Sequence, residues 1–235
     1  MGKNKLHRWA EMENYEHVVQ PSFEEVFRKD YKLKGKWREE FFKNSNPIIL
    51  ELGCGKGEYT IGMAEQYPMH NFLGVDIKGA RIWKGAKDSY ERGLKNVGFL
   101  RTRIELIDSF FAPNEIDEIW ITFPDPQIKK RRNKKRLTGS RFLLTYAAFL
   151  NKNGKIHLKT DSAELYEYTT ALLKYNNITP ELSSPDLYSG EIDNDILNIK
   201  THYEQLFLNE GKKITYIRFL IPFGQELAEL PEDHD

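Results

Sequence analysis

Short apolar runs alternate with longer amphipathic stretches from residue 47 to residue 175. The apolar runs have the length and the β-branched residues of buried strands, and they fall at residues 48–52, 71–76, 97–101, 118–123 and 155–160. Helix-like segments follow four of them, at residues 58–66, 79–92, 140–150 and 162–175. Strands and helices that alternate at this spacing predict an α/β fold, with a mostly parallel sheet and helices on both faces.

The two ends of the chain depart from this pattern. Residues 203–208 and 214–221 are rich in β-forming side chains, and the Asn-Glu-Gly sequence between them is typical of a turn, so we expect an antiparallel C-terminal hairpin that closes the sheet. Near the other end, residues 22–28 predict a helix in which Ser22 and Glu25 form a capping box. The expected organisation is an N-terminal extension at 1–45, one domain at 46–224 and an acidic tail at 225–235.

A glycine-rich turn follows the first predicted strand. Glu51 precedes three glycines at every second position, Gly53, Gly55 and Gly57. Glycines at the end of a strand let backbone N–H groups at a helix start approach a ligand, so the turn predicts a nucleotide or nucleoside site. A dinucleotide site has the spacing G-x-G-x-x-G instead. A carboxylate at position 51 would repel a pyrophosphate and favours a cationic ligand, although glycine-rich turns also occur with no ligand.

Polar residues stand at the ends of the other predicted strands. Asp76 ends the second strand, Arg103 follows the third, Asp125 lies between two prolines after the fourth, and Asp161 follows the fifth. Ligands in an open α/β sheet bind beyond the carboxyl ends of the strands, so we expect these residues around one site. Asp76 could accept hydrogen bonds from ribose hydroxyls or could cap the next helix. The two prolines hold the carboxylate of Asp125 rigidly.

Charge is balanced overall but concentrated in one place. The chain has 35 basic and 35 acidic residues, and seven of the basic ones lie within residues 129–136, which leaves a formal charge of minus seven for the rest. Like charges this close repel one another unless an anion neutralises them. The run lies between a predicted strand and a predicted helix rather than at a terminus. We therefore expect it to contact nucleic-acid phosphates, with a solvated face as the alternative.

Composition limits the remaining possibilities. Hydrophobic residues make up 40% of the chain and charged residues 30%, and no apolar run approaches the roughly 20 residues that cross a bilayer. Residues 1–10 are polar and basic, so we expect a cytoplasmic protein without a secretory signal. Cys54 is the one cysteine, which excludes an intramolecular disulfide and a zinc site built from cysteines, and we expect no metal. The sequence leaves monomer and homodimer open.

Five motifs, taken together and in order, carry a family resemblance. They are E-L-G-C-G-K-G from Glu51, V-D ending at Asp76, F-P-D-P with its basic tail from Phe123, T-D ending at Asp161, and T-H-Y-E from Thr201. Over residues 47–221 the chain resembles the bacterial tRNA (guanine-N7)-methyltransferases, which have a Rossmann-like class I methyltransferase fold. The F-P-D-P segment with its basic tail is the most specific part of the match.

The resemblance implies transfer of a methyl group from S-adenosylmethionine to N7 of a guanosine in the variable loop of tRNA. Asp125 would be the principal catalytic residue. The residues implied at the cofactor are Glu51, Gly53, Gly55, Asp76, Arg103 and Asp125. Those implied at the substrate nucleoside are Lys129, Asp161, Thr201, His202, Tyr203 and Glu204. Those implied at the tRNA backbone are Arg131, Arg132, Asn133, Lys134, Lys135 and Arg136.

The chain departs from the family pattern at two places. Gln127-Ile128 stands where the family usually has Trp-His after F-P-D-P, so any stacking or hydrogen bond from those side chains is absent. Arg103 stands where the family commonly has an acid near the adenine. The side chain of Arg103 cannot accept a hydrogen bond from the adenine amine, although its backbone can.

Two other functions stay open on the sequence alone. One is an S-adenosylmethionine-dependent methyltransferase that acts on another RNA base, since F-P-D-P is akin to the [DN]-P-P-[YF] motif of enzymes that methylate exocyclic amines. The aromatic residue here precedes the prolines, which disfavours that function. The other is an RNA-binding module with a vestigial cofactor site, which the intact Glu51 and Asp76 disfavour. An NAD enzyme ranks last because the G-x-G-x-x-G spacing is missing.

Overall fold

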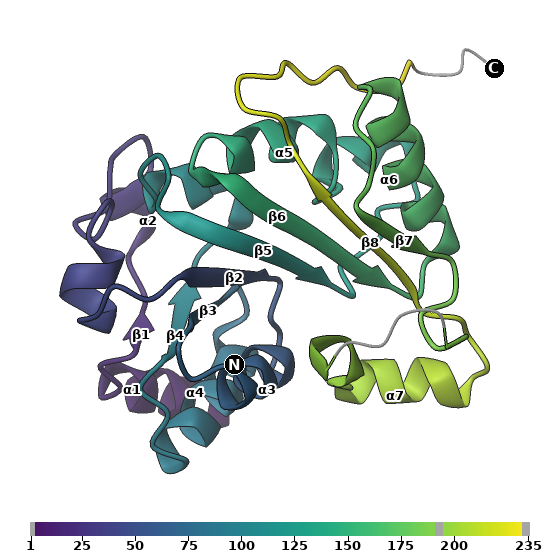
Figure 1. The fold of residues 1–235 in the computed structure, drawn as a ribbon. Coiled ribbons are helices and arrows are strands. Elements are labelled where there is room, and N and C mark those ends of the chain that lie inside the picture. The colour runs from purple at the N-terminus through teal and green to yellow at the C-terminus, as the bar shows by residue number, and fades with distance from the viewer. Residues whose placement is uncertain (1–2, 191–194, 232–235) are drawn as a thin grey trace.

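The computed structural model describes residues 3–190 and 195–231. In this part of the chain, eight strands form one sheet in the order β1-β4-β3-β2-β5-β6-β8-β7 (Figure 1). The strands from β1 to β6 run parallel, whereas β8 is antiparallel to both β6 and β7. Their bounds are β1 (Val18–Val19), β2 (Ile48–Leu52), β3 (Asn71–Asp76), β4 (Val97–Arg101), β5 (Ile116–Thr122), β6 (Leu150–Thr160), β7 (Leu182–Ser184) and β8 (Thr215–Leu220).

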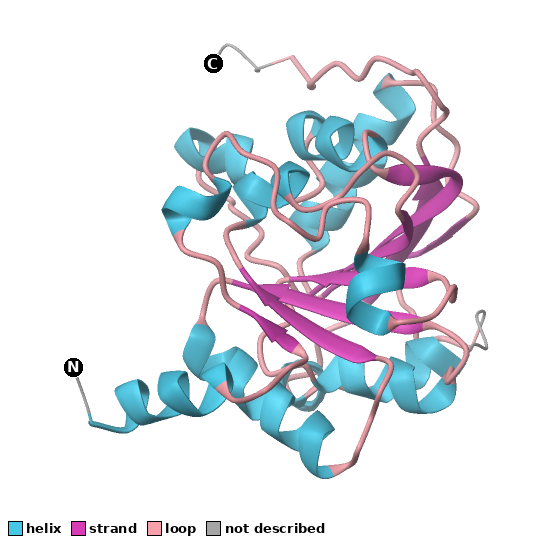
Figure 2. Cartoon of the chain, turned by 90° about the vertical axis from the view of Figure 1, so that its left-hand side faces the viewer, coloured by secondary structure: helices cyan, strands magenta, loops and turns pink. Residues whose placement is uncertain are grey.

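Helices cover both faces of the sheet, as Figure 2 shows. One apolar cluster lies under α5 and α6, and a second lies under α3 and α4, with alternate residues of the strands entering each. The helices are α1 (Lys3–Glu13), α2 (Phe23–Val26), α3 (Glu58–Gln66), α4 (Gly79–Glu91), α5 (Ser140–Ala147), α6 (Ala163–Tyr175) and α7 (His202–Asn209). One π-helical turn (Trp37–Phe42) and the 3-10 turns Ile104–Ser109, Lys130–Lys135 and Asp195–Asn198 complete the described elements.

The predicted fold class is confirmed: the sheet is mostly parallel, its C-terminal strands are antiparallel, and helices flank it. Strands β2 and β3 are buried along their whole length, which explains why they are apolar without alternation. The largest shift in a boundary concerns β6, which begins at Leu150, so the helix predicted at 140–150 ends at Ala147. None of the described helices is long and apolar enough to span a membrane.

The predicted C-terminal hairpin is wrong. Residues 203–208 belong to helix α7, and the strands that pair with β8 are β6 and β7. The Thr201 hydroxyl caps α7 by accepting a hydrogen bond from the backbone N–H of Glu204 at 3.2 Å. Glu204, in the first turn of α7, is fully buried. A helix that is capped by Thr201 and buries this carboxylate therefore takes the place of the expected strand.

The segment before β2 packs against the sheet. Strand β1 pairs with β4, with Val18 opposite Phe99, and α1 lies along α4 in Figure 1. The Trp37 side chain is fully buried in the core, and its indole N–H donates to the carbonyl of Phe110 at 2.8 Å. The predicted capping box is present, since Ser22 and Glu25 exchange hydrogen bonds of 2.8 and 3.3 Å at the start of α2. Strand β1 and Trp37 thus join the described residues before β2 to the sheet and its core.

Trp37 provides a test of that contribution. Replacing Trp37 with Ala should lower the free energy of unfolding by about 3–5 kcal/mol, because the change empties a large volume in the core. Urea denaturation measures the loss, and Phe23→Ala is the control because the Phe23 side chain is 49% exposed. If the two variants were equally stable, the segment would not be part of the cooperative core.

Candidate functional site

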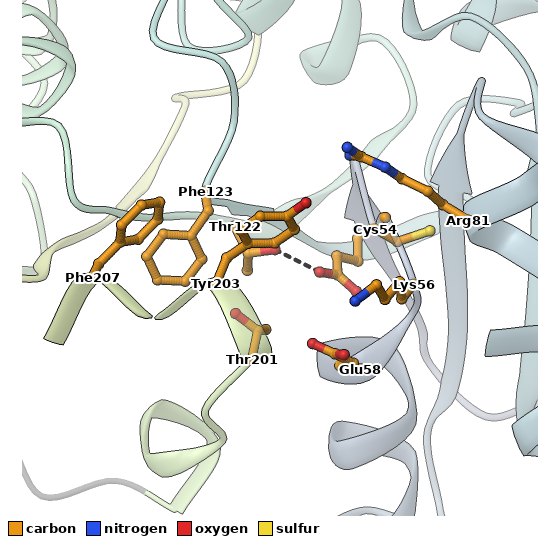
Figure 3. Close-up of a pocket in the computed structure, with 12 residues that line it drawn as sticks. Cys54, Lys56, Glu58, Arg81, Thr122, Phe123, Thr201, Tyr203 and Phe207 are labelled. Carbon is orange, nitrogen blue, oxygen red and sulfur yellow. Dashed lines mark hydrogen bonds between the residues drawn. The ribbon is translucent and has the colours of Figure 1, made fainter. Parts of the chain in front are cut away.

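A cavity of about 280 Å³ opens where the carboxyl ends of β2 and β5 meet helix α7 (Figure 3). The glycine turn and the start of α3 form one wall, and the beginning of α7 forms the other. In Figure 3 the rings of Phe123, Tyr203 and Phe207 gather on one side, and Lys56 and Arg81 lie across from them. The lining residues are Glu51, Gly53, Cys54, Gly55, Lys56, Glu58, Arg81, Thr122, Phe123, Thr201, Tyr203 and Phe207.

The backbone of the glycine turn is open toward this cavity. Gly53 has φ +81°, a conformation that side chains rarely allow, and a Cβ atom added there would meet no protein atom within 4 Å. The empty space is on the ligand side, because Gly53 lines the cavity. Gly57 serves packing instead, since a Cβ atom there would lie 2.7 Å from the ring of Phe99. The turn therefore presents bare backbone at Gly53 and brings α3 close to the sheet at Gly57.

Glu51 is a buried carboxylate beneath the turn, and only 2% of it is exposed. It accepts hydrogen bonds from the backbone N–H of Thr60 at 2.9 Å, from the Thr60 hydroxyl, and from the Thr122 hydroxyl at 2.5 Å. Burial raises the pKa of Glu51 to about 7, and the hydrogen bonds from Thr122 and Thr60 oppose that rise. Glu51 thus joins β2, β5 and the first turn of α3 around one ionisable group at the cavity.

Asp76 holds the adjacent loop. Its Oδ2 accepts from the backbone N–H of Gly55 at 3.0 Å, and its Oδ1 accepts from the backbone N–H of Lys78 at 2.7 Å. The carboxylate therefore fixes both the glycine turn and the chain that leads into α4. Each of these bonds occupies one lone pair of its oxygen. An ionised carboxylate has about four acceptor positions, so Asp76 can still accept hydrogen bonds from ribose hydroxyls.

A second cavity of about 510 Å³ adjoins the first and shares Gly53, Arg81 and Phe123 with it. The structure brings together here several residues that the sequence placed at one site: Asp76, Arg103 and Asp125 all line this cavity. Its other walls are partly apolar and include Ile77, Ile104, Leu137 and Phe142. A partly apolar slot that also carries carboxylates can hold a flat ring with hydrogen-bond donors.

The Phe-Pro-Asp-Pro turn is strained at both of its ends. Phe123 has φ +47° and Gln127 has φ +51°, which cost about 1–3 kcal/mol each in residues with side chains. The backbone N–H of Phe123 donates to the carbonyl of Lys159 at 2.8 Å, and the Asp125 carboxylate accepts from the backbone N–H of Gln127 at 3.1 Å. Asp125 is exposed at the cavity mouth. Asp125 therefore lies between two residues with left-handed backbone.

The basic run begins where the strained turn ends. Arg131, Arg132, Lys134 and Lys135 are exposed, and Lys135 reaches the wall of the second cavity. Arg136 differs, because its guanidinium lies 4.1 Å from the centre of the Tyr168 ring. Asn133 is half-buried, and Lys129 is exposed ahead of the short 3-10 turn. The cations of the run thus extend from the cavity mouth over the surface.

The remaining expected substrate residues do not share one environment. Thr201 and Tyr203 line the first cavity. His202 is exposed, and its backbone N–H donates to Glu58 at 2.7 Å. Glu204 is fully buried and absent from the lining of both cavities. Asp161 lies outside both linings as well, and Lys212 pairs with its carboxylate at 3.2 Å.

Several lining residues were not among the predicted site residues, and some of them add charge or an aromatic ring to the cavity. Lys56 and Arg81 bring positive charge to the cavity, and Phe207 lies on α7 with its ring centre 5.8 Å from that of Phe123. Arg81 could have been found from its helical spacing, because it stands one turn before Gly85, which packs against the carbonyl of Lys56 in the glycine turn. Phe207 could not, because the expected strand gave its side chain a different direction.

A glycine turn after β2 and an acidic residue at the end of β3 in a Rossmann-like sheet are typical of the class I methyltransferase fold. Residues 45–217 match the family described as "Putative methyltransferase". The tRNA (guanine-N(7)-)-methyltransferase of Bacteroides fragilis is 52% identical over 97% of this chain and 90% of that protein, and that of Christiangramia forsetii is 53% identical over 93% and 98%. This chain belongs to the tRNA (guanine-N7)-methyltransferase family.

Solved structures agree on the fold. The 16S rRNA methyltransferase KamB matches with a TM-score of 0.59 over 80% of this chain and 92% of that chain, at 13% identity. A likeness at this identity shows the shared fold alone. Among the residues that the structure describes, no group of three or more His, Cys, Asp or Glu side chains could hold a metal ion.

The cofactor of this family is S-adenosylmethionine, and the residues present fit it. Glu51 supplies a carboxylate near the glycine turn, which suits a cationic amino-acid end, and the open space at Gly53 would admit it. Asp76 and the apolar side chains of the second cavity suit a nucleoside. These residues would supply a hydrogen-bond acceptor at each end of the cofactor.

The ionisation of Glu51 leads to a pH prediction. Affinity for S-adenosylmethionine should fall as the pH drops below about 7, because the carboxylate that favours a cation becomes protonated there, with a limit of about tenfold per pH unit for one proton. Calorimetric titrations between pH 6 and 8 measure the effect. The amino group of the ligand also titrates, so Glu51→Gln is the control, and it should bind more weakly with a flatter pH profile. Equal profiles would remove Glu51 from the site.

Proposed function

We propose that this protein transfers the methyl group of S-adenosylmethionine to N7 of a guanosine in the variable loop of tRNA. The observation that carries the proposal is the second cavity, where Asp76 of the expected cofactor site, Asp125, and Lys135 of the basic run share one enclosure. Curated relatives at 52% and 53% identity are named for guanine-N7 methylation of tRNA, which supports the same reaction. The proposal places the protein in the cytoplasm with tRNA as its macromolecular partner.

The reaction requires alignment of the reacting atoms more than it requires proton transfer. N7 of neutral guanine has a free lone pair, so no general base is needed, and the protein must bring N7 into line with the methyl carbon and sulfur. S-adenosylmethionine supplies an electrophilic methyl group when bound. Transfer leaves the purine cationic, and a carboxylate that accepts hydrogen bonds from guanine N1–H and its amino group favours the developing charge.

Asp125 suits that role better than Asp161. The carboxylate of Asp125 is exposed at the cavity mouth and is held by a strained turn, whereas Asp161 is paired with Lys212 outside both linings. Preorganisation of this kind lowers the cost of placing the charge during the reaction. Asp125 is therefore the proposed catalytic residue, and it also borders the cofactor side of the cavity.

The other roles follow the cavities. Thr201 and Tyr203 would contact the target nucleoside where the first cavity meets the second at Phe123, and Phe207 would pack beside it. Lys129 and Asp161 remain candidates for the rim of that site. The proposed cofactor residues are Glu51, Gly53, Gly55, Asp76 and Arg103, and the proposed tRNA backbone contacts are Arg131, Arg132, Asn133, Lys134, Lys135 and Arg136.

The departures from the family pattern have structural counterparts. Gln127 adopts a left-handed backbone conformation at the end of the strained turn and lines the second cavity. The side chain of Ile128 is 57% exposed. Neither position offers the aromatic ring or the imidazole that the family usually has there. The hydrogen bond from Gln127 to Asp125 comes from the backbone, so it does not depend on the missing side chains.

The reaction can be tested directly. The protein would be incubated with labelled S-adenosylmethionine and unmodified tRNA, and the nucleosides would then be analysed. Label in 7-methylguanosine supports the proposal. Label in another nucleoside would indicate a methyltransferase for another RNA base, and bound tRNA without label would indicate a binding module with a vestigial cofactor site.

Asp125 provides the sharpest residue test. Asp125→Ala should lower kcat by about a hundredfold or more, because the carboxylate that favours the cationic purine is lost. The affinity for S-adenosylmethionine is measured in parallel, and Asp108→Ala is the control for removing an acid elsewhere on the surface. A variant that retained normal turnover would exclude the catalytic role.

The basic run makes a separate prediction. Arg131→Ala and Lys134→Ala should weaken tRNA binding and lower the slope of log K against log salt by about one unit for each lost phosphate contact. Binding at several salt concentrations measures the slope. Lys152→Ala removes an exposed lysine that lies near Phe223 and serves as the control. Equal slopes in all three variants would make the run a solvated face.

A further inference from the structure

Lys159 and Glu204 form an ion pair in the interior of the protein. The Lys159 Nζ lies 2.8 Å from the Glu204 Oε1, and both side chains are fully buried. Lys159 is near the end of β6, and Glu204 is in the first turn of α7. The pair therefore joins a central strand to the helix that carries one wall of the first cavity.

Further hydrogen bonds bring other segments to the same point. The Lys159 ammonium also donates to the carbonyls of Leu197 at 2.8 Å and Ile199 at 3.2 Å, which occupies its three donors. The Tyr188 hydroxyl donates to the Glu204 Oε1 at 2.5 Å. Burial lowers the pKa of Lys159, and the neighbouring Glu204 carboxylate opposes that change. Lys159 thus connects β6 to Leu197 and Ile199, which lie shortly before α7.

Stability alone is a poor reason for such a pair. Removing two charges from water costs free energy, and well-packed apolar residues of similar volume often replace a buried pair without loss of stability. The second oxygen of Glu204 also has no hydrogen-bond partner among the described residues, which adds to the cost. The free-energy cost of this ion pair is better explained by the position in which it holds α7 against β6.

That geometry concerns both aromatic walls of the cavity. The backbone carbonyl of Lys159 accepts from the N–H of Phe123 at 2.8 Å, while its side chain holds α7. Phe123 begins the strained turn that carries Asp125, and Phe207 faces it from α7 with a ring separation of 5.8 Å. Lys159 therefore contacts both walls, one through its backbone carbonyl and the other through its side chain.

We propose that Lys159 and Glu204 are positioning residues that fix α7 against the turn before Asp125, so that Glu204 acts through Lys159 and does not bind the substrate base. Tyr188 assists by orienting the Glu204 carboxylate. This inference rests on the proposed methyl transfer, because it gives the space between the walls to the target guanine. Thr201 and Tyr203 remain the residues of the T-H-Y-E sequence that face that space.

A double-mutant cycle tests the inference. Lys159→Met and Glu204→Met should each lower kcat/KM for tRNA by about tenfold to a hundredfold, with most of the change in KM, and the double variant should fall no further than the worse single variant. Glu204→Gln, which keeps an acceptor for Lys159 and Tyr188, should retain more activity than Glu204→Met. Multiplicative losses in the double variant would mean that Glu204 contacts the substrate directly, and they would overturn the inference.

Hydrogen exchange gives a second measurement that needs no methyl acceptor. In the unliganded Lys159→Met/Glu204→Met variant, the amides of residues 202–209 should exchange about tenfold faster or more, while those of α6 keep their rates. Unchanged exchange in residues 202–209 would overturn the inference. Glu65→Gln, which breaks an exposed ion pair with Arg92, is the control and should change neither rate. A wild-type protein that fails to methylate tRNA would refute the proposed function, and the exchange data would still decide whether the pair positions α7.

Discussion

The hydrogen bonds of the Glu51 carboxylate are the interaction on which the rest of the site depends. They hold the end of β2, the hydroxyl of Thr122 on β5 and the first turn of α3 around one buried group. Because the N-terminus of a helix carries a partial positive charge, α3 helps to stabilise a carboxylate there. The glycine turn lies between these anchors, so its open backbone is fixed relative to the sheet. A cofactor site needs such a fixed backbone, since every hydrogen bond to a ligand depends on its direction.

Buried polar groups build the opposite wall as well. Lys159 and Glu204 form an ion pair in a fully buried environment, and the backbone N–H of Phe123, which has a left-handed backbone, donates to the carbonyl of the same lysine. Desolvated ions and left-handed backbone both cost free energy. The large apolar clusters on the two faces of the sheet offset that cost. The stability that the core supplies thus offsets the free-energy cost of the buried ions and the left-handed backbone at one edge of the sheet.

Much of this arrangement could be predicted from the sequence. The central strands were placed almost to the residue because they are buried on both faces and read as continuous apolar runs. The glycine turn, Asp76 and Asp125 were expected at one edge because parallel strands deliver their carboxyl ends together, and these residues do line adjoining cavities.

Helix α7 shows where local pattern stops being informative. Residues 203–208 have strand-forming side chains, but Glu204 finds its partner on β6, and a buried carboxylate with a lysine opposite outweighs a weak local preference. Phe207 reaches the cavity for the same kind of reason, because its direction depends on how α7 packs. The sequence by itself determined which strands are buried, where the glycine turn lies and where the charges are grouped, since these features depend on neighbours in the chain. Only the tertiary structure decided which buried charges pair and which rings face the cavity, because those contacts join residues that are distant in the chain.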